Sequence, residues 1–136
     1  MTYAGPLPSV TEETEGFFEA AKRGVFALHR CAHCRNWYWP ASACRRCDNE
    51  PFLANMRWEA ASGRGTLFSV VVPRRTFHPA FPAPFVYALV KLDEGPLMPC
   101  GIDVDPAEAR VGLPVEAYFV KLSDEFTVPR FRAIAK

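Results

Sequence analysis

The chain has 136 residues, a formal net charge of +1 and an apolar fraction of 49%. Its length allows one ordinary domain, or a small domain with a satellite module, because an independent core usually takes roughly 100–150 residues. The near-neutral charge disfavours a protein that binds nucleic acids through a basic surface. No apolar run approaches the roughly 20 residues of a membrane-spanning helix.

The first expected element is an amphipathic helix within residues 11–24, "TEETEGFFEAAKRG". Acidic residues come early in this segment and basic residues late, which matches the polarity of a helix dipole. Phe17, Phe18 and Ala21 fall on one side at helical spacing, so the pattern predicts a helix of about 13 residues. Gly16 lowers helix stability by up to about 1 kcal/mol relative to Ala, and we therefore expect the helix to need a packing partner.

Four cysteines follow in "CAHCRNWYWPASACRRC", where two Cys-x-x-Cys pairs are separated by nine residues. The flanking residues 25–30 and 36–40 read as two short strands of a hairpin. The N-terminal residues lack the basic and apolar regions of a secretory signal, so we expect a cytoplasmic protein whose thiols stay reduced. Reduced cysteines at this spacing predict a structural zinc site with four thiolate ligands. The predicted ligands are Cys31, Cys34, Cys44 and Cys47.

Other interpretations of the cysteines are a thioredoxin-like redox motif, an iron–sulfur cluster, or iron in place of zinc. His29 or His33 could also replace one thiolate. A site closed by four thiolates leaves no open position for water or substrate, and the expected role of the metal is therefore structural. The nearby arginines and the aromatic run "WYW" are then expected to balance the site's charge and to form the core of the hairpin.

After the cysteines the sequence becomes rich in β-formers, with predicted strands at residues 66–72, 85–92, 114–122 and 126–134. Four or five short strands and no further helix favour a small antiparallel barrel of the oligonucleotide/oligosaccharide-binding (OB) type. The connection at residues 73–84, "PRRTFHPAFPAP", is long and holds four prolines and two phenylalanines. Long ordered loops on a rigid scaffold often carry function.

The chain resembles the domain-of-unknown-function thirty-five family in "FFEAAKRG", the cysteine segment, "SGRGTLFSVVV", "ALVKLDEG" and "VPRFRAI". The resemblance implies a mainly β fold with an N-terminal helix, a rubredoxin-like zinc ribbon and a small antiparallel OB-fold barrel. The corresponding divisions are an N-terminal helical segment at 1–28, a zinc ribbon at 29–57 and an OB-fold barrel at 58–136. One departure is Arg35, because many relatives have a glycine directly after the second cysteine, where a positive φ helps turn the chain.

The same resemblance implies a noncatalytic, zinc-binding accessory subunit of a thiolase-like, lipid-transfer-type enzyme complex that cleaves or forms carbon–carbon bonds on acyl-CoA thioesters. The partner enzyme would then supply the catalytic residues. Two alternatives are a single-stranded nucleic-acid-binding OB-fold protein and a free-standing acyl-CoA-binding module. We expect no catalytic site in this chain, because acidic neighbours work against ionisation of Cys100, although His78 could meet Cys100 in space.

Arginines can hold phosphates or partner carboxylates, and aromatic side chains among prolines form a stiff apolar ridge. A competing interpretation is that the loop phenylalanines close one end of the barrel. The candidate contacts to CoA or to a partner are Arg64, Arg74, Arg75, Phe77, His78 and Phe81.

Overall fold

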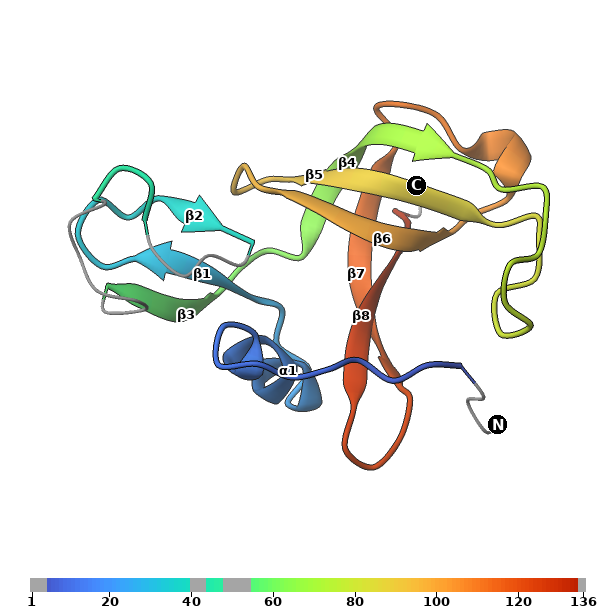
Figure 1. Ribbon diagram of the computed structural model, residues 1–136. Coiled ribbons are helices and arrows are strands. Elements are labelled where there is room, and N and C mark those ends of the chain that lie inside the picture. The colour runs from blue at the N-terminus through green and yellow to red at the C-terminus, as the bar shows by residue number, and fades with distance from the viewer. Residues whose placement is uncertain (1–4, 40–43, 48–54, 135–136) are drawn as a thin grey trace.

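This computed structural model describes residues 5–39, 44–47 and 55–134, which contain one α-helix, one short 3₁₀ helix (η1) and two sheets (Figure 1). The first sheet, here called the ribbon, has the strand order β2-β1-β3, and the second is a closed barrel with the order β4-β5-β6-β8-β7. This architecture confirms the predicted mainly β fold with an N-terminal helix, a cysteine-bearing ribbon and an OB-type barrel. The elements are α1 (Glu15–Lys22), β1 (Ala27–Cys31), β2 (Trp37–Tyr38), β3 (Met56–Ala60), β4 (Arg64–Val71), β5 (Val86–Leu92), β6 (Leu97–Asp103), η1 (Pro106–Glu108), β7 (Pro114–Lys121) and β8 (Thr127–Ala133).

Helix α1 has eight residues and is shorter than the sequence predicts. The expected first turn is instead a separate turn, in which the N–H of Thr14 donates to the carbonyl of Thr11 over 3.0 Å. The segment predicted to hold the helix ends at Gly24, and this residue lies just past α1, with a φ of +74° and an N–H that donates to the carbonyl of Ala21. The next N–H, of Val25, reaches back to Ala20, so both bonds of a Schellman cap are present. No helix in the described residues is long and apolar enough to span a membrane.

The packing partner of the helix is an aromatic cluster between the ribbon and the barrel. The ring of Phe17 lies 4.3 Å from that of Trp39 and 6.2 Å from that of Phe26, measured between centroids. Phe26 in turn lies 5.9 Å from Phe131 in the barrel core. Helix, ribbon and barrel therefore share one continuous hydrophobic core.

Strand β3 completes the ribbon by pairing with β1 along its whole length, from Ala27 opposite Ala60 to Cys31 opposite Met56. The sequence did not indicate this strand, because the alternating charges in "MRWEA" give no apolar run. The barrel segment was expected to begin at residue 58. This residue lies inside β3, which pairs with β1 of the ribbon.

The barrel closes where β4 pairs with β7, and all neighbouring strands are antiparallel except β6 and β8. All four strands predicted for this half of the chain are present as β4, β5, β7 and β8, and their ends differ from the predicted ones by at most two residues. β6 was missed, because Pro99 and Gly101 inside it disfavour a strand. Both residues pair with β5, opposite Leu89 and Tyr87.

Replacing Gly16 with alanine is expected to destabilise the protein, although alanine favours a helix. A Cβ atom at this position would overlap the indole of Trp58, which lies directly against the helix backbone. Overpacking of this kind typically lowers stability by about 1–3 kcal/mol. Urea denaturation followed by circular dichroism measures the change. Glu19→Ala, on the exposed side of the same helix, is the control and should stay within about 0.5 kcal/mol of wild type. A Gly16→Ala protein as stable as wild type would contradict this packing.

Candidate functional site

The four predicted metal ligands come together at one end of the ribbon. Their sulfur atoms all lie within 4.8 Å of one another, and those of Cys34 and Cys44 are 3.5 Å apart. Cys31 and Cys44 are buried, whereas Cys34 is exposed and Cys47 half-buried. This grouping could hold a metal ion.

Two tight turns present these sulfurs. In the first, the N–H of Arg35 donates to the carbonyl of Cys31 over 3.0 Å, and in the second the N–H of Cys47 donates to the carbonyl of Cys44 over 3.2 Å. Arg35 has a φ of +64°, so an arginine takes the backbone conformation that glycine adopts more easily. Residues 40–43, which join the two turns, lie outside the described part of the chain.

Two of the nearby arginines already have partners within the ribbon. A carboxylate oxygen of Glu59 lies 2.8 Å from Arg35 Nη2 and 3.4 Å from Arg30 Nη1. The guanidinium of Arg30 also lies 4.3 Å from the centroid of Trp37, and it covers part of this aromatic face. These contacts fix the charges beside the cysteines and leave less of Trp37 available for stacking on a ligand.

Hydrogen bonding lowers the pKa of one of these thiols, whereas burial and the closeness of the other thiols raise the pKa of another. Burial tends to raise the pKa of Cys44, but hydrogen bonds from the Tyr38 hydroxyl and from backbone N–H groups lower this pKa to about 6. Burial and the neighbouring thiols raise the pKa of Cys47 to about 12. Several thiolates this close are therefore unfavourable together unless a cation neutralises their charge.

The two histidines beside the cysteines differ in their exposure to solvent. His29 is buried in the ribbon, with its ring centroid 3.8 Å from that of Trp58. His33 is exposed in the first turn. Among the described residues, the grouped ligand atoms belong to the four cysteines alone.

Most of the other candidate contacts lie in the connection between β4 and β5, here called the 73–85 loop. Phe77 is 78% exposed and Phe81 is 38% exposed, so Phe77 does not close the barrel end. Local hydrogen bonds hold the loop: the N–H of Ala83 donates to Thr76 Oγ1 over 2.9 Å, and the N–H of Ala80 donates to His78 Nδ1 over 3.0 Å.

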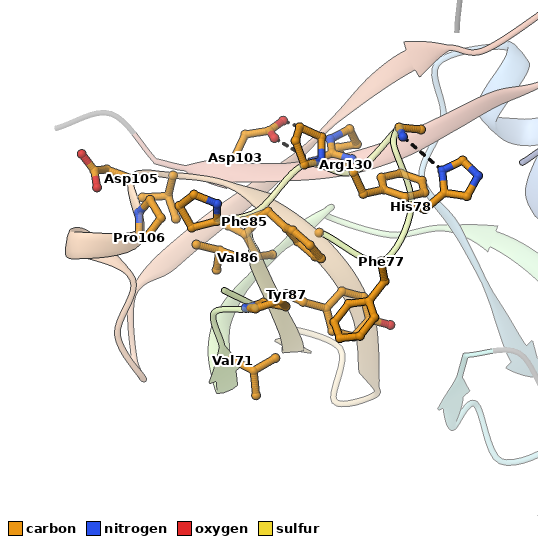
Figure 2. Close-up of a pocket in the computed structure, with 18 of the residues that line it drawn as sticks. Val71, Phe77, His78, Phe85, Val86, Tyr87, Asp103, Asp105, Pro106 and Arg130 are labelled. Carbon is orange, nitrogen blue, oxygen red and sulfur yellow. Dashed lines mark hydrogen bonds and ion pairs between the residues drawn. The ribbon is translucent and has the colours of Figure 1, made fainter. Parts of the chain in front are cut away.

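A groove of about 1040 Å³ lies between this loop and one end of the barrel (Figure 2). Phe77, His78 and Phe81 line it, together with residues from β5, β6, η1, β7 and β8. Arg74 and Arg75 belong to the same loop but do not line the groove. Arg64 is farther away: its neighbour Gly65 pairs with Leu92, at the end of β5 opposite to the groove.

The groove also contains an ion pair that sequence analysis missed. Arg130 donates from Nη2 to Asp103 Oδ1 over 2.8 Å and from Nε to Oδ2 over 3.1 Å (Figure 2). These residues are 27 positions apart, and the parallel pairing of β6 and β8 brings them together. No local pattern signals such a contact.

Cys100 lies on β6 and is opposite Ala88 of β5. Burial raises the pKa of its thiol to about 11, although the charge of Arg130 acts in the other direction. The thiol is therefore protonated at neutral pH and is a poor nucleophile. His78 accepts its hydrogen bond from Ala80 within the loop.

Comparison with known proteins places these features in a family. The profile described as "ChsH2, C-terminal OB-fold domain" matches residues 58–120. The chain is 32% identical over 130 residues to a "Probable enoyl-CoA hydratase alpha subunit" of Thermomonospora curvata, a match that covers 93% of this chain but only 39% of that relative. Among solved structures, the "Ltp2-ChsH2(DUF35) aldolase" has a chain with a TM-score of 0.82 and 31% identity, over 93% of this chain and 98% of that one.

A further relative matches along most of its own length. It is a "DUF35 domain-containing scaffold protein" of Methanothermobacter thermautotrophicus, 32% identical over 121 residues, which are 85% of this chain and 87% of the relative. The expected resemblance is thereby confirmed, and the chain belongs to the DUF35 family, the domain-of-unknown-function thirty-five family.

Proposed function

We propose that this protein is a noncatalytic accessory subunit that assembles with a thiolase-like enzyme acting on acyl-CoA thioesters. The observation that carries the proposal is the likeness, along nearly its full length, to the DUF35 chain of an aldolase named for two components, Ltp2 and ChsH2. The names of two further relatives, a hydratase alpha subunit and a scaffold protein, favour the same kind of role.

The chemistry of the described residues supports a role in assembly. A nucleophile needs a lowered pKa or an adjacent base, whereas the pKa of Cys100 is raised to about 11. Arg130 and Asp103 neutralise each other in the groove. The partner enzyme would then carry out the carbon–carbon bond cleavage or formation. This chain would bind to the partner and support its structure.

We also propose that the four cysteines hold a structural zinc ion. Sulfurs at about 2.3 Å from one tetrahedral zinc lie about 3.8 Å apart. The Cys34–Cys44 distance of 3.5 Å and the 4.8 Å limit that holds for every pair lie on either side of this value. Zinc would supply the positive charge that allows all four sulfurs to ionise together. Four thiolates complete its coordination, so the ion would stabilise the ribbon and take no part in a reaction.

Metal analysis tests the zinc proposal. The protein purified without chelators should contain about one zinc ion per chain, and Cys44→Ser should lose it, since serine is a poor zinc ligand. The variant's melting temperature should fall by roughly 10 °C or more, because metal-binding energy contributes to folding. Cys100→Ala is the matched control and should keep its zinc. A wild-type protein that contains no metal, or a Cys44→Ser variant with full occupancy, would refute the proposal.

Two other functions fit less well. A single-stranded nucleic-acid binder that used the ribbon would need exposed aromatic faces and unpaired cations there, whereas Arg30 and Arg35 both bind Glu59 and Arg30 covers part of Trp37. A free-standing acyl-CoA-binding module would bind CoA thioesters without a partner. The candidate contacts to CoA or to the partner remain the six predicted residues, namely Arg64, Arg74, Arg75, Phe77, His78 and Phe81.

Affinity purification tests the accessory role. The tagged full chain, expressed in its source organism, should capture a thiolase-like enzyme in stoichiometric amounts, identified by mass spectrometry. Activity of this enzyme on acyl-CoA should fall about tenfold or more when the chain is removed. The isolated chain should show no thioester turnover, and its dissociation constant for acetyl-CoA should be weaker than about 1 mM in calorimetry. Turnover by the isolated chain, or full activity of the enzyme without it, would exclude the accessory role.

A further inference from the structure

Several large exposed apolar side chains gather around the groove. Ten such side chains are exposed in the described residues, and four of them line this groove (Figure 2). These four are Val71, Phe77, Phe81 and Tyr87, with exposures of 55%, 78%, 38% and 44%. Val71 and Tyr87 also pair directly across β4 and β5. A contiguous apolar patch of this kind usually marks an interaction surface.

The most exposed of these residues is held by a preorganised loop. Thr76, next to Phe77 in the sequence, accepts a hydrogen bond from the Ala83 N–H across the loop. His78, on the other side, pairs with Phe81, whose N–H donates to the His78 carbonyl over 2.9 Å. Bonds on both sides of Phe77 therefore restrain the backbone that carries its ring before any partner binds. Such preorganisation lowers the entropy lost on association.

The charge of the loop indicates which kind of molecule would bind to this surface. Residues 73–85 contain Arg74, Arg75 and His78 but no acidic residue. Both arginines are exposed, and the Arg75 guanidinium lies 5.6 Å from the centroid of the Phe77 ring. An aromatic side chain flanked by cations complements an apolar socket with carboxylates at its rim.

The position of Phe77 favours a protein over a small molecule as the occupant. A small ligand enclosed by the groove would bury one side of this ring and leave the rest in water. Only a surface that comes over the loop can bury a side chain that is 78% exposed. Aromatic residues that become fully buried at an interface commonly dominate the binding energy.

From these observations we infer that the 73–85 loop, with Val71 and Tyr87 beside it, is the docking surface for the partner enzyme. Phe77 enters an apolar socket on that enzyme, and Arg74 and Arg75 pair with acidic residues at the rim of the socket. The inference rests on the proposed function, because the occupant is the thiolase-like enzyme of the affinity purification. Within the set of six candidate contacts, it assigns binding energy to the loop and none to Arg64.

The test compares the affinities of full-length variants for that captured enzyme, measured by biolayer interferometry. Phe77→Ala should weaken binding about 30-fold or more, as expected for a central aromatic contact. The double variant Arg74→Glu/Arg75→Glu should weaken binding at low salt, mainly through slower association. Its defect should shrink in about 0.5 M sodium chloride, whereas the defect of Phe77→Ala should persist, because salt screens only the charges.

Matched controls come from one segment outside the groove. Val111 is 68% exposed and Arg110 is also exposed, and neither lines the groove. Val111→Ala and Arg110→Glu should bind as wild type does, and all variants should keep the wild-type melting temperature, because the replaced side chains are exposed.

Three outcomes would overturn the inference. If wild type binds and Phe77→Ala binds equally well, the docking surface is wrong while the accessory role stands. An equal loss with Val111→Ala would show that the effect is not specific to the loop. If wild type itself does not bind the thiolase-like enzyme, the proposed function fails and the inference fails with it.

Discussion

The contacts of Phe17 join the three parts of this molecule, and the placement of the other elements depends on them. Its ring packs against Trp39 and Trp58 of the ribbon region and against Phe26, which contacts Phe131 in the barrel. Phe26 directly precedes β1, and Cys31 ends this five-residue strand in the sulfur cluster. The cysteine cluster and the barrel core therefore lie at the two ends of one short strand. Any metal that orders the cysteines also orders the strand through which the ribbon meets the barrel.

The barrel presents its most distinctive surface away from that junction. Figure 1 shows the ribbon and the 73–85 loop on opposite sides of the barrel. The groove beside the loop collects residues from all five barrel strands and from η1. Its ion pair, Asp103 with Arg130, has no net charge. A concave surface with several large exposed apolar side chains has the character of a binding surface.

Sequence patterns predicted the parts of this fold that depend on local chemistry. Cysteine spacing indicated the sulfur cluster, and β-rich runs indicated β4, β5, β7 and β8, because both signals lie within short segments. β6 was missed because Pro99 and Gly101 disfavour a strand locally, and pairing with β5 overrides this preference. The Asp103–Arg130 pair could not be predicted, since it depends on the parallel register of β6 and β8. The 73–85 loop was noticed for its length and prolines, but only the structure shows that Phe77 points into solvent.

The separation of the cluster and the loop determines how a metal could influence docking. The hydrogen bonds that shape the loop join Thr76 to Ala83 and His78 to Ala80, so its form depends on contacts within the loop itself. No described side chain of the ribbon lines the groove. A metal at the cysteines would therefore act on docking through the folded population of the whole chain, since its binding energy contributes to folding. A direct effect on the geometry of Phe77 would require a contact between ribbon and groove, and the two lie on opposite sides of the barrel.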